Sequence, residues 1–388
     1  MSQKVKLFVG TRKGGFIFTS DAKRKKWQAS DILFKSWNVM HMQLDGRDGR
    51  LHAAVNHFVY GPTTHYSDDM GAHWTQAPQV PSLPRASKSG RPASSPEELD
   101  FENQGQVKTA DVPEKLLKVW HITPGRASEP GTLYAGAQPA SLFVSHDRGE
   151  SWTLNEPLYD HPQRGQWNPG AGGLALHTIL PDPSDPQRMY VAVSAGGCYR
   201  TDDGGRTWAP FNKNVRADFM GEQRFPEFGQ CVHKIAMHPD RPQVLYQQNH
   251  CGVYRSDNAG VDWIDIGDGK LPTRFGFPMV VAPHDPRTIF VVPEESDEYH
   301  MSVDGQFAVW RSRDAGGSWQ QLTNGLPGQA RLVVLRDALA ADSLDQAGIY
   351  AGTNTGQLFY SRDEGDSWEV LAGYLPPILS VEAAVVDD

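Results

Sequence analysis

An eight-residue pattern recurs along this chain and constrains its fold more than any other feature. The pattern is Ser or Thr, any residue, Asp or Asn, any residue, Gly, two further residues, and Trp. Six copies begin at Ser67, Ser145, Thr201, Ser256, Ser312 and Ser361, and a decayed seventh runs from Ser20 to Trp27. Self-similarity of this kind is the signature of a repeat architecture. We therefore expect residues 1–388 to form a single repeat domain.

The distance between copies predicts what each repeat contains. Successive copies start 47, 78, 56, 55, 56 and 49 residues apart, which is close to the length of four short strands. The 38 glycines and 28 prolines are scattered along the chain, as short strands and turns require. Each repeat also carries an apolar pair that we assign to its second strand: Leu7-Phe8, Leu51-His52, Leu133-Tyr134, Met189-Tyr190, Leu245-Tyr246, Ile289-Phe290 and Ile349-Tyr350.

The two ends of the chain predict how the repeats are joined. Residues 5–10 form a second strand with no inner strand before it, and residues 378–386 form a strand with no partner after it. If the last strand supplies the missing one, no sheet edge is left open. The fold class is therefore an all-β, seven-bladed β-propeller closed by the C-terminal strand. Residues 85–114 fill the longest gap and are expected to be an inserted surface loop.

The repeated octapeptide resembles the Asp box, also called the BNR repeat, of sialidases, sortilin ectodomains, xyloglucanases and photosystem assembly factors. The resemblance implies a structural turn remote from any active site. In such a turn the carboxylate caps backbone N–H groups, the glycine takes a conformation closed to other residues, and the tryptophan is buried. Residues 229–234 and 247–254 also resemble bacterial BNR-like repeat proteins, which are often labelled glycosyl hydrolase or exo-sialidase.

Charge and composition exclude several classes of partner. The net charge is −9, and the only basic run, Lys23 to Lys26, is expected to be a solvated hairpin tip, so nucleic acid is not an expected partner. No apolar run is long enough to span a membrane. The three cysteines, Cys198, Cys231 and Cys251, cannot form an even disulfide framework, which predicts a cytoplasmic location.

Four histidines fall at related positions of the repeat. His121, His177 and His233 each precede the apolar pair of their repeat by twelve residues, and His41 precedes its pair by ten. Imidazoles at one height around a central channel are suited to a divalent transition metal such as Fe, Cu, Ni or Zn. The alternative is that each imidazole donates a hydrogen bond to the neighbouring sheet.

The turns after the second strands carry a set of polar residues. Counting five residues past the first member of each apolar pair gives Arg12, Asn56, Gln138, Ser194, His250, Glu294 and Asn354, with His57 beside Asn56. We expect Arg12, Asn56, His57, Gln138, His250 and Asn354 to line a hydrated funnel that binds a small molecule or glycan. The alternative is that turn positions are polar in any protein.

Three functions compete on this sequence. The first is a metal-dependent enzyme acting on a small polar molecule. The second is a sialidase-like glycoside hydrolase or glycan-binding propeller, for which Glu227, Glu294 and Glu382 are the candidate carboxylates. Glu382 has other possible roles, because it could orient a ligating histidine or pair with Arg331. The third is a non-catalytic scaffold. The histidines favour the first, and sialidase activity is disfavoured because no arginine triad can be identified.

Overall fold

The computed structural model describes residues 3–84, 115–169 and 172–387, so the predicted insertion at 85–114 lies outside the described residues. The elements are almost all β-strands. Contacts divide the chain into two compact units. The first unit comprises residues 1–44, 212–226 and 233–388, and the second comprises residues 45–211 and 227–232. No helix in the described part of the chain is long and apolar enough to cross a bilayer.

The first unit contains one large sheet and two four-stranded sheets. The large sheet has the order β27-β26-β25-β24-β28-β1-β2-β3, and the others run β16-β17-β18-β19 and β20-β21-β22-β23. The strands are β1 (Gln3–Thr11), β2 (Gly14–Asp21), β3 (Gln28–Ala29), β4 (Asn38–Leu44), β16 (Val232–Met237), β17 (Leu245–Asn249), β18 (Gly252–Ser256), β19 (Ile264–Asp265), β20 (Gly276–Val281), β21 (Ile289–Pro293), β22 (Val309–Ser312), β23 (Gln320–Leu322), β24 (Val334–Ala341), β25 (Ile349–Thr353), β26 (Leu358–Ser361), β27 (Glu369–Ala372) and β28 (Ile378–Asp387). Two 3₁₀ turns, η2 (Asp218–Met220) and η3 (Val303–Gly305), lie between strands.

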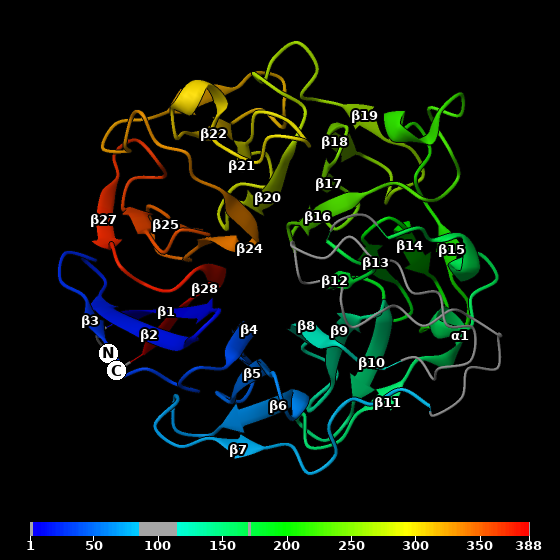
Figure 1. Cartoon of the computed structure of the whole chain (residues 1–388), viewed down its shortest axis with the longest axis horizontal. Helices are drawn as coiled ribbons and strands as arrows, with labels where there is room; N and C mark the ends of the chain where they lie inside the picture. The colour runs from blue at the N-terminus through cyan, green and yellow to red at the C-terminus, as the bar shows by residue number, and fades with distance from the viewer. Residues whose placement is uncertain (1–2, 85–114, 170–171, 388) are drawn as a thin grey trace. The chain divides into compact units, whose positions relative to one another are not determined.

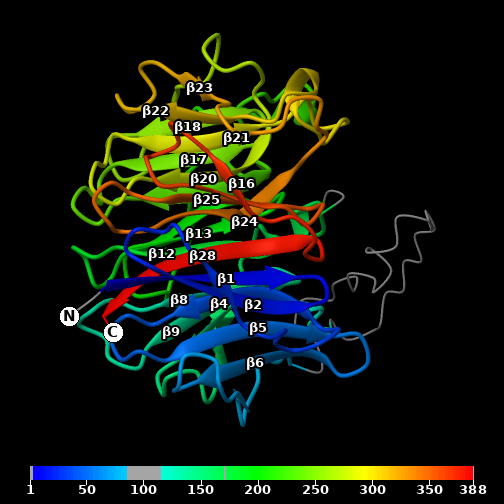
Figure 2. The same cartoon turned by 90° about the vertical axis from the view of Figure 1, so that its left-hand side faces the viewer.

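The C-terminal strand pairs with the N-terminal strand, as the sequence predicts. β28 runs antiparallel to β1 from Gln3↔Asp387 onward, and the two lie side by side in both views (Figures 1 and 2). The other edge of β28 meets β24 in a parallel bridge between Asp337 and Ser380. The last strand is therefore an interior strand of its sheet. Valines and leucines of β1, β24 and β28 pack in one core cluster that includes Leu7, Val334 and Val381.

The second unit consists of short antiparallel sheets. Two of them are four-stranded, with orders β11-β10-β9-β8 and β12-β13-β14-β15. Its elements are β5 (Leu51–His57), β6 (Gly61–Ser67), β7 (Thr75–Gln76), β8 (Lys118–Pro124), β9 (Leu133–Gln138), β10 (Ser141–Ser145), β11 (Thr153–Leu154), α1 (Glu156–Tyr159), η1 (Arg164–Gln166), β12 (Leu176–Pro181), β13 (Met189–Val193), β14 (Gly197–Thr201) and β15 (Ala209–Pro210). Four-stranded antiparallel sheets joined by tight turns are the building units of β-propellers.

The repeated octapeptide forms the same turn in all six intact copies, which confirms its assignment as a structural motif. In the copy at 312–319, the hydroxyl of Ser312 donates to Asp314 and accepts from the N–H of Gly316, both at 2.8 Å. The Asp314 carboxylate also accepts the N–H of Ser318 at 2.8 Å. The fifth residue is always a glycine with positive φ, 85° in Gly316. The fourth residue has positive φ as well: Met70, Arg148, Gly204, Ala259, Ala315 and Glu364.

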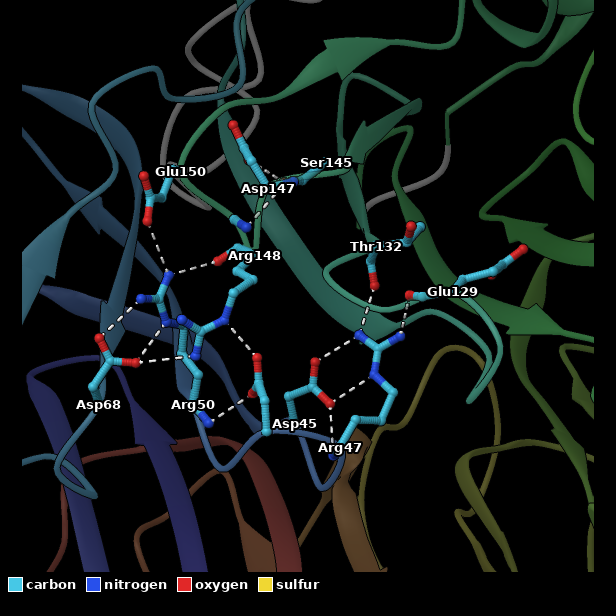
Figure 3. A network of polar contacts seen from close by, with 12 residues as sticks. Asp45, Arg47, Arg50, Asp68, Glu129, Thr132, Ser145, Asp147, Arg148 and Glu150 are labelled. Atoms are coloured by element: carbon cyan, nitrogen blue, oxygen red, sulfur yellow. Dashed lines mark hydrogen bonds and ion pairs between the residues drawn. The ribbon is translucent and has the colours of Figure 1, made fainter.

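Three arginines, of which Arg50 and Arg311 are buried and Arg255 is partly exposed, fasten some of these turns to a neighbouring sheet of the same unit. In the second unit, Arg50 binds both oxygens of Asp68 at 2.8 Å and donates to the carbonyl of Arg148, the fourth residue of a box (Figure 3). In the first unit Arg255 and Arg311 donate to the carbonyls of Ala315 and Glu364, which hold the same position in their boxes.

The decayed repeat departs from the solvated tip expected for Lys23 to Lys26. Arg24 within this run is only 5% exposed, and its guanidinium contacts Asp342 at 2.9 Å. It also donates to the carbonyls of Gln346 and Arg362. A buried ion pair therefore anchors this turn, whose displaced Asp21 still accepts the N–H of Lys23. Composition alone could not distinguish Arg24 from its exposed lysine neighbours.

Candidate functional site

The four histidines predicted to bind a metal are divided between the units. His41 and His233 belong to the first unit and His121 and His177 to the second. Among the residues that the structure describes, no group of three or more metal-ligating side chains includes His41, His121 or His177. His233 belongs to one such group, together with Cys231 and His250.

Two of the four histidines lie within hydrogen-bond distance of main-chain carbonyl oxygens. Both ring nitrogens of His177 lie near protein oxygens, with Nδ1 3.1 Å from Oγ1 of Thr178 and Nε2 3.0 Å from the carbonyl of Val232. His233 directs Nδ1 to the carbonyl of Gly276 at 2.6 Å. Two of the four imidazoles thus bond to main-chain carbonyls, which is the alternative role considered above. A bound Fe, Cu, Ni or Zn ion stays a prediction.

The first unit gathers a cluster of rings around the turns that follow β17 and β21. His250 makes edge contacts with Phe219 and Phe275, at centroid distances of 5.2 and 5.1 Å. His300 packs against Phe275 at 5.0 Å and Phe277 at 5.3 Å. We call these five residues the ring cluster. Phe219 is half exposed, whereas Phe275 is buried, so the cluster extends from the surface into the core.

A buried carboxyl group belongs to the same part of the unit. Glu294 follows β21 directly, its N–H donates to the carbonyl of Phe275, and its side chain is fully buried. Neither carboxyl oxygen has a hydrogen-bond partner within the described residues. Burial raises the pKa of Glu294 to about 8, and the positive charge of Arg336 opposes this shift only in part. Glu294 is therefore protonated at neutral pH and holds a transferable proton.

A second carboxylate three residues further on has the opposite character. Oδ2 of Asp297 lies 3.0 Å from Nε2 of His250, and this hydrogen bond lowers the pKa of Asp297. The side chain is about half exposed. One connection, between β21 and β22, thus carries a neutral carboxylic acid and an ionised carboxylate. Environments that push two pKa values apart in this way define acid and base roles.

The other two predicted carboxylates have different surroundings. Oε1 of Glu382 on β28 lies 3.1 Å from Nε2 of His41 on β4. Glu227 is exposed and belongs to the second unit. Neither shows the burial that keeps Glu294 protonated.

The predicted funnel residues also fall into two groups. Arg12, His250 and Asn354 lie in the first unit, where Arg12 and Asn354 are exposed. The second unit holds Asn56, His57 and Gln138. Asn56 and Gln138 are buried, and both amide atoms of each lack a hydrogen-bond partner within the described residues.

Sequence reasoning missed Asp297, Phe219, Phe275 and His300. The only available signal was position, because Asp297 and His300 lie in the connection that begins with Glu294. Phe275 and Phe219 come from other connections, and no repeat spacing marks them.

The curated relatives that match this chain are named as xyloglucanases. No family model matches the chain. A xyloglucanase of Acetivibrio thermocellus is 25% identical over 280 residues, which is 62% of this chain and 30% of that enzyme. A probable oligoxyloglucan-reducing end-specific xyloglucanase of Neosartorya fischeri is 24% identical over 208 residues, 52% of this chain and 24% of the other. This chain thus spans less than a third of the length of these relatives.

The structural comparison agrees at the level of fold. The GH74 xyloglucanase of Xanthomonas campestris superposes with a TM-score of 0.51 at 17% identity, covering 96% of this chain and 60% of that enzyme. This likeness supports an all-β, propeller-type fold. It does not single out the sialidase-like proteins that the Asp box suggested.

These comparisons correct the functional prediction. The sequence favoured a metal-dependent enzyme for a small polar molecule over a glycoside hydrolase, and that preference is wrong, because the similar proteins are xyloglucanases, which are glycoside hydrolases. That preference rested on the regular spacing of the histidines. His177 and His233 satisfy carbonyl groups, and such a structural role repeats with the same period as a ligand set.

Proposed function

We propose that this protein is a glycoside hydrolase that acts on a β-linked glucan of the xyloglucan type. The relatives named above support the substrate class. The single structural observation that carries the proposal is Glu294, a buried carboxyl group with no hydrogen-bond partner in the described chain and a pKa of about 8. Glycoside hydrolysis requires such a neutral acid together with an ionised carboxylate.

We assign the proton donor to Glu294 and the ionised partner to Asp297. Glu294 gives its proton to the glycosidic oxygen, so that the leaving sugar departs as a neutral alcohol. Asp297 accepts a proton from the water that attacks the anomeric carbon, or attacks that carbon itself, and the separation of the two groups in the sugar complex decides which. Because Glu294 is fully buried, its neighbouring side chains have to move before a glycosidic oxygen reaches it.

We also propose the finer description of the fold. The seven second-strand pairs all fall within strands, namely β1, β5, β9, β13, β17, β21 and β25. Together with the pairing of β28 and β1, this supports seven blades and a ring closed by the C-terminal strand.

The test is release of reducing ends from xyloglucan and from unbranched β-glucans. Glu294→Gln and Asp297→Asn should each lower kcat by about 10²-fold or more, since acid–base catalysis contributes 10²–10⁴-fold. Asp257→Asn, an exposed aspartate paired with Arg255 in the same unit, serves as the matched control and should keep full activity.

An aryl glycoside with a good leaving group separates the two roles. It needs little protonation, so Glu294→Gln should retain cleavage of this substrate while Asp297→Asn does not. Wild-type protein that cleaves none of these substrates would exclude the proposed activity and leave a non-catalytic binding protein.

A further inference from the structure

The hairpin between β5 and β6 carries exposed apolar side chains at its tip. Phe58 is 91% exposed, Val59 63% and Tyr60 75%. Exposing large apolar side chains to water costs free energy, and a cluster of them on the surface indicates a binding site for a ligand or another molecule. The tip belongs to the second unit, whereas the ring cluster and Glu294 belong to the first.

The tip is held in a defined conformation by His57. Nδ1 of His57 accepts the N–H groups of Val59 and Tyr60 at 3.1 and 3.2 Å. The imidazole also stacks on the ring of Tyr60, with centroids 4.7 Å apart and planes 25° apart, and lies 4.7 Å from Phe58 at 30°. The rings of Phe58 and Tyr60 are therefore ordered before any partner arrives, which lowers the entropy cost of binding.

Asn56, at the base of the same hairpin, has unused hydrogen-bonding capacity. It is 8% exposed and pairs across the hairpin with Pro62. Neither its amide nitrogen nor its amide oxygen has a hydrogen-bond partner in the described part of the chain. A buried amide without partners costs about 1–3 kcal/mol. Because both amide atoms are closed off from solvent, a ligand that supplies a donor and an acceptor recovers this free energy only after the side chains that cover Asn56 move aside.

The chemistry of the hairpin restricts the partner. Residues 56–62 read Asn-His-Phe-Val-Tyr-Gly-Pro and include no acidic side chain, lysine or arginine. An anionic or cationic polymer would find no counter-charge on this segment. A neutral sugar ring has C–H groups on its faces and hydroxyls at its rim, which match aromatic faces beside an amide.

We propose that Phe58, Tyr60 and Asn56 form a binding subsite for a neutral β-linked polysaccharide. The proposal rests on the proposed function for the class of glycan, but it concerns binding and not bond cleavage. The two rings pack against faces of the sugar units. Once the side chains that cover it move aside, the Asn56 amide pairs with one hydroxyl as donor and another as acceptor. His57 positions the rings without contacting the sugar through Nδ1, which its own hairpin occupies.

Native electrophoresis of the full chain in gels that contain neutral xyloglucan tests this subsite. The wild-type protein should be retarded, and Phe58→Ala/Tyr60→Ala should weaken the apparent affinity about tenfold or more, as the loss of exposed aromatic contacts does at binding hot spots. Tyr374→Ala removes a fully exposed tyrosine of the other unit, and this control should migrate like the wild type.

Asn56→Leu supplies the second arm. Leucine has a similar size and no polar atoms, so the variant should unfold at the same or higher denaturant concentration while its affinity for xyloglucan falls by roughly tenfold. Lost affinity in a variant of undiminished stability distinguishes a ligand contact from a structural role.

The possible outcomes separate the subsite from the proposed activity. Unchanged affinity in Phe58→Ala/Tyr60→Ala overturns the subsite. Wild-type protein that xyloglucan does not retard overturns it as well, and this is the result expected if the tip binds another protein instead. If the wild-type protein cleaves xyloglucan, the proposed function stands whether or not the subsite is supported. Retardation through Phe58 and Tyr60 without cleavage of any glycan supports the subsite and overturns the activity.

Discussion

Nε2 of His41 lies 3.1 Å from Oε1 of Glu382, and this contact joins β4 to the C-terminal strand β28 within the first unit. The imidazole is completely buried, whereas the carboxylate keeps 28% of its surface exposed. The pair therefore lies at the boundary between core and solvent, where the carboxylate can remain hydrated while it accepts a hydrogen bond. Because Glu382 lies on β28, removing this pair tests how much it contributes to the stability of the last strand.

Removing this carboxylate should loosen the terminal strand. Glu382→Ala deprives a buried histidine of a charged partner and should lower the free energy of unfolding by about 1–3 kcal/mol. Glu382→Gln retains an oxygen acceptor and should cost less. Urea denaturation measures both, and an alanine variant as stable as the wild type would show that the contact contributes nothing.

The stability of the protein should depend on the ionisation of Glu294. Its pKa is raised from 4.5 to about 8 in the folded chain, so between these values the folded state holds a proton that the unfolded state has lost. The contribution of Glu294 to the free energy of unfolding is fully present below pH 4.5 and is lost as pH rises toward 8. Glu294→Gln should gain stability relative to the wild type across this window, by up to about 1.4 kcal/mol per pH unit. Denaturation curves at intervals from pH 5 to 9 measure the difference, and a constant difference would contradict the shift.

The arginine between the turns in Figure 3 should not be replaceable by lysine. Nε and Nη2 of Arg50 donate to the two carboxylate oxygens of Asp68, and Nη1 donates to the carbonyl of Arg148. A single ammonium group cannot reproduce that geometry. Arg50→Lys should cost about 1–3 kcal/mol in urea denaturation. Arg206→Lys is the control, because Arg206 is exposed and its guanidinium donates to the carbonyl of Asp203, three residues away in the same turn. Similar losses in the two variants would argue against a fastening role.

The Asp box should contribute to acid sensitivity. Hydrogen bonds from the Ser318 N–H and from hydroxyls lower the pKa of Asp314 from 3.8 to about 2. Stability from this group is therefore present above pH 3.8 and is lost as pH falls through about 2. Asp314→Asn should keep the turn, since Asn258 accepts the same bonds in its own box, and should remove this part of the acid dependence. Asp314→Ala should lose about 1 kcal/mol at neutral pH, as a missing cap does. Acid titration followed by circular dichroism compares the three proteins.

The local features of this fold could be predicted from sequence, because their causes are local. Ser312, Asp314 and Gly316 satisfy one another within five residues, so the octapeptide alone specifies the turn. The pairing of β1 with β28 was predictable as well, because an unpaired strand at each end leaves few alternatives.

The candidate site could not be predicted in the same way. Its properties depend on burial and on contacts with residues that are distant in the sequence. Glu294 is a candidate by position, but its raised pKa comes from complete burial. The spacing of His177 predicts a metal ligand, but it could not show that Nε2 of His177 lies 3.0 Å from the carbonyl of Val232. The same limit applies to Asn56, whose lack of partners depends on everything that packs around it.

The fourth residue of each Asp box has a consequence for engineering. Six different contexts place Met70, Arg148, Gly204, Ala259, Ala315 and Glu364 at this position, and all have φ between 54° and 73°. A position that accepts methionine, arginine, glycine, alanine and glutamate looks unconstrained to anyone choosing substitutions by variability. Valine or isoleucine there would nevertheless strain the turn, because branching at Cβ is poorly tolerated at positive φ. The positive φ at this position is therefore shared by all six boxes, although no single residue type marks it.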